Sequence, residues 1–164
     1  MNKYEKGLEI LEEKFGNGKD NIIALATIAV EPNTDGNPRP VVRDIDAHYT
    51  DGKFYSVTWG ESSKMLQIAQ NNEVAITPCF GWFTASGVGE NLGWVLDPKN
   101  AELRTRLREV FANWYDMAND ESNKNCCILE IRLTNGVINL NHHETLIHMD
   151  FTNKSATVTG KELT

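Results

Sequence analysis

The pattern of hydrophobic and polar positions along the chain predicts mostly β-strands, together with three helices. Residues 21–30, NIIALATIAV, are rich in apolar and β-branched side chains. Turn-forming residues fill 31–38, EPNTDGNP, before an extended pattern resumes at 39–49, RPVVRDIDAHY. We therefore predict two strands joined by a loop across 31–38.

A dipeptide at Asp51-Gly52 predicts the next turn, because it tolerates the positive φ that a two-residue hairpin needs. The strand before it and the strand at 53–59 are therefore expected to pair antiparallel. A further strand follows at 73–80, EVAITPCF. The segment 81–96, GWFTASGVGENLGWVL, combines spaced glycines with aromatic residues, which indicates a bent or bulged strand.

The C-terminal part of the chain gives a weaker pattern. CCILEIRL at 126–133 and VINL at 137–140 flank Asn135-Gly136, and this arrangement predicts a last hairpin with its turn at that dipeptide. The tail 152–164, TNKSATVTGKELT, is expected to be loose and polar.

Three segments carry apolar residues at helical spacing. Residues 1–15 predict an amphipathic helix that ends at glycines, and a second helix begins near Ser62 or Ser63. A longer third helix is expected from Asp97 to Met117, with a proline in its first turn. Antiparallel strands with helices in this order predict a small closed or half-closed barrel, with the helices packed outside it.

Length and composition narrow the class of protein. A chain of 164 residues predicts one domain spanning 1–164, large enough for a substantial core. It has 23 acidic against 16 basic residues and no block of like charge, which favours small-molecule partners over nucleic acid or a membrane surface. No stretch approaches the roughly 18 apolar residues of a membrane-spanning helix.

The cysteines and histidines do not indicate a metal site. Adjacent Cys126 and Cys127 lie in an apolar run, so we expect buried thiols, a reducing compartment and a cytoplasmic location. His142, His143 and His148 have no cysteine or carboxylate at ligand spacing, so we interpret them as surface residues of a last strand.

The stretch 54–72, FYSVTWGESSKMLQIAQNN, carries the candidate chemistry. A strand reaches a loop containing Thr58 and Ser63 and then a helix start, where hydroxyls, backbone N–H groups and the positive helix end suit a phosphate. Lys64 adds charge, and Arg43 on the paired strand offers a bidentate guanidinium. The alternative is a serine helix cap, a solvated Lys64 and a surface ion pair for Arg43.

The segment 36–76 resembles the core of the pyridoxamine 5′-phosphate oxidase-like superfamily of flavin-binding split β-barrels, in its general-stress-protein and nitroimidazole-resistance-like branch. The shared order is Gly-x-Pro, an arginine on the next strand, Asp-Gly, an aromatic strand, a Ser-Lys step, a helix, Asn-Asn and a valine-containing strand. The weaker resemblance extends over about 21–134. It implies a mainly β split barrel with flanking helices.

The resemblance also implies FMN bound in a cleft between the two subunits of a homodimer. The implied cofactor-binding residues are Arg43, Ser63 and Lys64 for the phosphate and Val57, Thr58 and Trp59 along the isoalloxazine ring. Arg39 is the alternative to Arg43, and the spacing from the strand that ends near Thr58 favours Arg43. The acidic Glu61 is a departure from the family pattern in this loop. Its charge would weaken phosphate binding unless its side chain points to solvent.

Two classes of function follow from the resemblance. In the first, bound FMN exchanges electrons with a small molecule, which makes the protein an oxidoreductase. In the second, the protein holds the flavin for storage, sensing or stress protection; a haem-binding relative would need an axial ligand from the C-terminal histidines. The chain is not expected to be a true pyridoxamine 5′-phosphate oxidase, because after Arg132 only Lys154 and Lys161 remain to bind a substrate phosphate.

Overall fold

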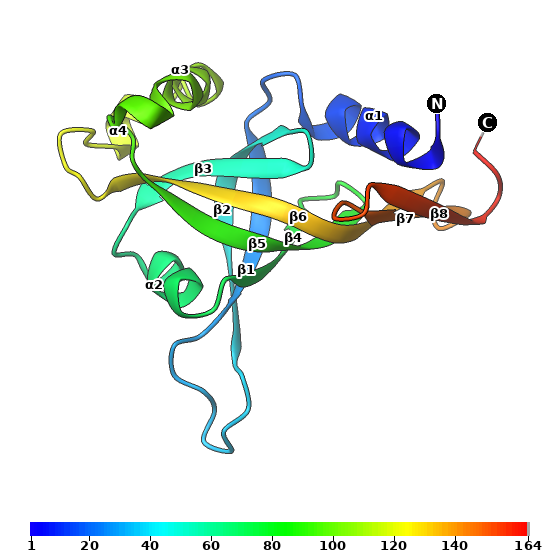
Figure 1. Cartoon of the computed structure of the whole chain (residues 1–164), viewed down its shortest axis with the longest axis horizontal. Coiled ribbons are helices and arrows are strands. Elements are labelled where there is room, and N and C mark those ends of the chain that lie inside the picture. Colours follow the sequence, from blue (N-terminus) through cyan, green and yellow to red (C-terminus); the bar gives the residue numbers. More distant parts are fainter. Residues whose placement is uncertain (164) are drawn as a thin grey trace.

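The strands form one antiparallel sheet that closes on itself, in a computed structural model that describes residues 1–163. The strands are β1 Asn21–Ile28, β2 Pro40–Thr50, β3 Lys53–Trp59, β4 Glu73–Pro78, β5 Phe83–Trp94, β6 Cys126–Leu140, β7 Thr145–Asp150 and β8 Ser155–Gly160. Their order is β3-β2-β1-β4-β5-β6-β7-β8, and β3 also pairs with β6. Six strands therefore close a barrel, and β7 and β8 extend it on one side (Figure 1).

The helices lie outside the barrel, as predicted. They are α1 Lys3–Phe15, α2 Ser63–Gln70, the short 3₁₀ helix η1 Pro98–Asn100, α3 Ala101–Val110 and α4 Tyr115–Ala118. Figure 1 shows α1 at the end with β7 and β8, α3 and α4 together at the other end, and α2 below them. No helix among residues 1–163 is long and apolar enough to cross a membrane.

Alternating side chains of the strands fill the barrel interior. Leu25, Phe54 and Ile131 are fully buried there, and β4 alternates strictly between exposed and buried positions. A second cluster lies outside the barrel, where α3 packs on the other face of β3 and β6. The predicted burial of the thiols of Cys126 and Cys127 is confirmed.

The barrel is split between β2 and β3. The predicted hairpin at Asp51-Gly52 is confirmed, since both residues have positive φ. The two strands pair over only three residues, from His48–Thr50 to Lys53–Tyr55. Beyond these pairs β2 continues along β1 and β3 along β6, so residues 56–59 of β3 have one edge without a strand partner among the described residues.

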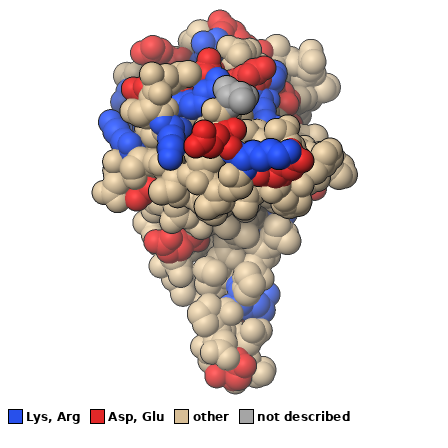
Figure 2. Space-filling model, turned by 90° about the vertical axis from the view of Figure 1, so that its right-hand side faces the viewer, with Lys and Arg blue, Asp and Glu red and all other residues tan. Residues whose placement is uncertain are grey.

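The loop between β1 and β2 forms a long arm, as the turn-forming residues of 31–38 predicted. Figure 1 shows it extending away from the barrel, and Figure 2 shows it tapering below the body of the molecule. Its base is tied to α2, because the Gln70 side chain donates a hydrogen bond to the Val30 carbonyl at 3.2 Å.

The predicted turn at Asn135-Gly136 is wrong, because β6 runs without interruption from Cys126 to Leu140. The glycine is required for another reason. A Cβ at Gly136 would lie 2.8 Å from the Thr84 carbonyl oxygen of β5, so only glycine permits this close approach of the strands. The register of β5 against β6 shifts beside it, between Ser86 and Gly87, and this confirms the predicted irregularity of β5.

Residues 155–160 of the tail form a strand where a loose segment was expected. Residues Ser155–Gly160 pair along their whole length with β7, and β8 packs beside α1. The polar composition reflects an edge strand with one exposed face rather than the absence of structure.

The third helix is shorter than predicted. It ends at Val110, and a turn at 111–114 separates it from α4. Phe111 and Tyr115 both enter the cluster beneath the helices, so the apolar pattern continues across the turn although the helix itself ends.

Candidate functional site

Arg43 is held in place by neutral partners. Its Nη1 donates to the Leu25 carbonyl at 3.2 Å and to the Thr27 hydroxyl at 2.6 Å, and its Nη2 donates to the Gln67 side-chain oxygen at 2.7 Å. Burial lowers the pKa of the guanidinium. Arg43 makes no ion pair in the part of the chain described, so the alternative of a surface ion pair is wrong. A guanidinium has five N–H groups, so two remain for a ligand.

Lys64 lies close to this guanidinium and is not fully solvated. Burial lowers the pKa of its ammonium group, and the charge of Arg43 lowers it further. Its nearest polar partner is the Ser62 hydroxyl at 3.4 Å. No carboxylate within residues 1–163 pairs with it. Two partly buried cations therefore lie within range of one another's charge, an arrangement that an anion near both would stabilise.

The start of α2 adds hydrogen-bond donors to these charges. Ser62 occupies the cap position, as predicted, but its hydroxyl makes no capping bond and the first turn has no acidic residue. The backbone N–H groups of a first helical turn have no partner within the helix. Ser63 and Glu61 are both exposed, and within residues 1–163 Glu61 makes no ion pair with either cation.

The three predicted ring-binding residues of β3, which are Val57, Thr58 and Trp59, point to different sides of the strand. The side chain of Val57 lies in the cluster beneath α3, so only its backbone borders the open edge of β3. Thr58 is buried on the opposite face, which also carries Phe54. Trp59 ends the strand with 44% of its surface exposed.

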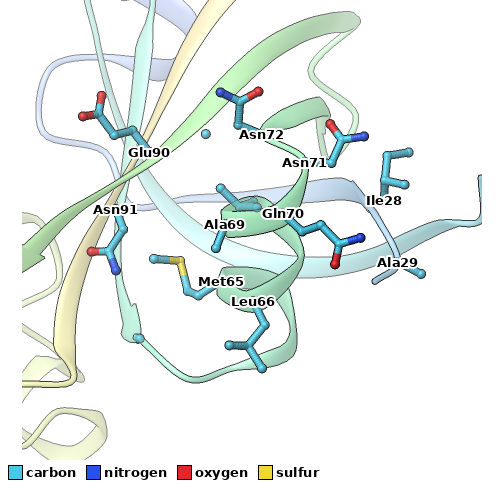
Figure 3. A pocket seen from close by; sticks show the side chains of 13 residues that line it. Ile28, Ala29, Met65, Leu66, Ala69, Gln70, Asn71, Asn72, Glu90 and Asn91 are labelled. Carbon is cyan, nitrogen blue, oxygen red and sulfur yellow. The ribbon is translucent and has the colours of Figure 1, made fainter. Parts of the chain in front are cut away.

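A hollow of about 670 Å³ flanks the other side of α2 (Figure 3). Figure 3 shows Met65 and Ala69 on the helix beside Asn91 of β5. Of the loop residues between β3 and α2, only Gly60 lines the hollow. None of the six predicted cofactor residues lines it. The predicted site is thus separate from this hollow.

Two residues that hold Arg43 in place, Thr27 and Gln67, were not predicted from the sequence. Thr27 is 1% exposed and lies on the inward face of β1 with Ile23 and Leu25. Its hydroxyl also hydrogen-bonds Gln67 at 2.5 Å, which connects β1, β2 and α2 around Arg43. A polar residue at an inward position of an otherwise apolar strand is the signal that could have identified Thr27.

The fold is that of the pyridoxamine 5′-phosphate oxidase-like split barrels, as the sequence resemblance predicted. No protein-family model and no curated protein sequence matches the chain. Solved structures do match, at identities that establish the fold alone. General stress protein 26 from Bacillus anthracis is 13% identical with a TM-score of 0.58, covering 79% of this chain and 90% of its own.

Two further similar structures are those of proteins described as flavin-binding. A pyridoxamine 5′-phosphate oxidase-related, FMN-binding protein from Nostoc punctiforme is 14% identical with a TM-score of 0.59, covering 97% of this chain and 96% of its own. A FAD-binding protein from Mesorhizobium loti is 16% identical with a TM-score of 0.55, covering 79% and 90%. The structural similarity thus includes flavin-binding proteins.

Proposed function

We propose that this protein is a flavoprotein that binds FMN, with the phosphate between Arg43, Lys64 and the start of α2. The observation that carries the proposal is the pair of neighbouring, partly buried cations that lack a carboxylate partner in the described chain. A phosphate dianion supplies that missing negative charge. The Ser63 hydroxyl and the backbone N–H groups of the first turn supply further donors.

The open edge of β3 suits the flat ring. Backbone groups along 56–59 have no strand partner on that edge, and hydrogen bonds to the polar side of an isoalloxazine would satisfy them. Val57 would contribute its backbone, and Thr58 and Trp59 would border the ring. The Nostoc protein, which is described as FMN-binding, supports the choice of FMN.

The reaction class we propose is electron transfer to or from a small molecule. Bound FMN supplies that redox chemistry, while the residues named here hold its phosphate and orient its ring. Anaerobic addition of NADH or NADPH, followed at the flavin absorbance, tests the proposal. Bleaching of the bound flavin is expected for an oxidoreductase, whereas a stable spectrum with both donors would favour a flavin-binding protein without catalytic activity.

We predict a homodimer with the flavin in its interface. One edge of residues 56–59 has no strand partner among the described residues, and Trp59 at the end of the strand is 44% exposed, so a second subunit would cover both the ring and this apolar side chain. Light scattering should give twice the chain mass of 18.4 kDa at micromolar concentration. A monomer that still binds FMN would contradict this prediction.

We predict that the protein does not oxidise pyridoxamine 5′-phosphate. Lys161 pairs with Glu144 at 2.8 Å, and the hollow that Arg132 and Lys154 line lies at the Lys53 end of β3. Lys53 and Trp59 are six residues apart, roughly 20 Å along a strand, so these cations lie too far away to hold a substrate against the flavin bound by the same chain. Aerobic incubation should yield no pyridoxal 5′-phosphate; turnover at about one per second or faster would refute the prediction.

A further inference from the structure

A second group of cations meets at the end of the barrel opposite the proposed flavin site. Lys53 and Arg132 are direct partners in the antiparallel pairing of β3 with β6. Lys154, in the turn between β7 and β8, lines the same hollow. Like charges directly opposite one another in a sheet repel, and Glu130 of β6 offsets only the charge of Lys53.

The cations surround a hollow with an apolar floor. The hollow has a volume of about 270 Å³, and its apolar lining is Tyr4 and Leu8 of α1, Leu133 of β6 and Phe151 at the end of β7. The ring of Tyr4 meets the ring of Phe151 edge to face at 6.2 Å. The floor is thus built from three elements that pack together, and it is broad enough for one ring-sized group.

The acidic groups around the hollow pair with only one of its three cations. Lys53 lies 3.6 Å from Glu130, whose carboxylate also accepts a hydrogen bond from Tyr55. Arg132 and Lys154 make no ion pair with any residue of 1–163, and neither does Asp51, which also lines the hollow.

Charge across the same region of the surface is mixed. Asp150 accepts two hydrogen bonds from Asn153, at 2.9 and 2.8 Å. Figure 2 shows basic and acidic side chains intermingled over the end of the molecule that carries α1, β7 and β8. The hollow itself therefore has three lining cations against one lining carboxylate, in a chain that is acidic overall.

We propose that this hollow binds a small aromatic anion, a carboxylate or phosphate monoester whose ring packs on the apolar floor. Its anionic group would lie among Arg132, Lys53 and Lys154, where the guanidinium offers bidentate hydrogen bonds. The site is separate from the flavin surface and does not depend on the proposed function.

Titration with phenyl phosphate and with benzoate, followed by ¹H–¹⁵N spectra of the full chain with saturating FMN, tests the proposal. Both probes should give saturable shifts at the amides of Gly52 and Leu133, and their relative affinities identify the preferred anion. Arg132→Gln should weaken binding about tenfold or more, as expected for loss of a charge-assisted bidentate contact. Arg39→Gln is the matched control, because Arg39 is exposed on the arm and does not line the hollow.

Three results would overturn the proposal. The first is an equal affinity for neutral benzyl alcohol, which would show an apolar hollow without anion recognition. The second is an equal loss of affinity in both arginine variants, which would show attraction to overall charge. The third is the absence of saturable shifts at the amides of Gly52 and Leu133. Shifts at Thr27 and Gln67 alone would count as this result, because they would place the probe at the proposed flavin site.

Discussion

Replacing Arg43 by alanine is expected to weaken FMN binding by about 1.5–3 kcal/mol, or roughly ten- to 150-fold, because a charge-assisted bidentate contact to phosphate is lost. Lys64→Ala should have an effect of similar size. Titration of FMN fluorescence, which bound protein quenches, measures both. The proposed site is wrong if both variants bind FMN as the unmodified protein does.

Variants of the neighbouring residues separate charge from orientation. Gln67→Leu keeps the guanidinium of Arg43 but removes the acceptor that fixes it at 2.7 Å, so a smaller loss of affinity is expected. Arg39→Ala removes an equal charge from the exposed arm and should leave the affinity unchanged. Urea unfolding of each variant shows whether a loss of affinity reflects a loss of fold.

Elements set by neighbouring residues were predicted correctly from the sequence. The hairpin at Asp51-Gly52 depends only on local φ values, and the start of α2 depends on a polar residue before an apolar helical pattern. The Asn135-Gly136 turn failed because the same dipeptide permits two outcomes. A glycine serves a tight turn or the close approach of another strand, and here Thr84 of β5 decides between them from far away in the sequence.

The candidate site was predicted in part. The sequence identified Arg43 and Lys64 as cations near a helix start, and in the structure the charge of Arg43 lowers the pKa of Lys64. It did not identify Thr27 and Gln67, which lie 16 and 24 residues from Arg43 and contact it through the pairing of β1 with β2 and the packing of α2 on β1. The cations around Arg132 were missed for the same reason, since the pairing of β3 with β6 brings them together.

Glu121 shows a further long-range arrangement, which holds α3 and α4 against the barrel. Its carboxylate accepts hydrogen bonds from Arg104 at 3.0 and 2.6 Å and from Arg108 at 3.0 Å. Its backbone carbonyl accepts from the indole of Trp94 in β5 at 2.8 Å. Because α3 covers the face of β3 that carries Val57, this cluster supports the strand at the proposed flavin site.

We predict that Glu121→Gln lowers the free energy of unfolding by about 2 kcal/mol at pH 7. Hydrogen bonds led by Arg104 lower the pKa of Glu121 from 4.5 to about 2, and such a shift corresponds to about 3 kcal/mol before solvent screening. The two arginine side chains are 31% and 33% exposed, which reduces the estimate. Urea unfolding measures the difference.

The pH dependence distinguishes this charge cluster from simple packing. A carboxyl group whose pKa is lowered on folding stabilises the protein above its unfolded pKa, and this stabilisation is lost as the pH falls from about 4.5 through 2. The difference between Glu121→Gln and the unmodified protein should therefore be about 1 kcal/mol smaller at pH 3.5 than at pH 7.

Glu109→Gln is the control, since its ion pair with Arg106 is 3.6 Å long and more than half exposed on both sides. It should change stability by less than about 0.5 kcal/mol at either pH. A difference for Glu121→Gln that stays constant between the two pH values would show that the glutamate acts through packing and not through its charge.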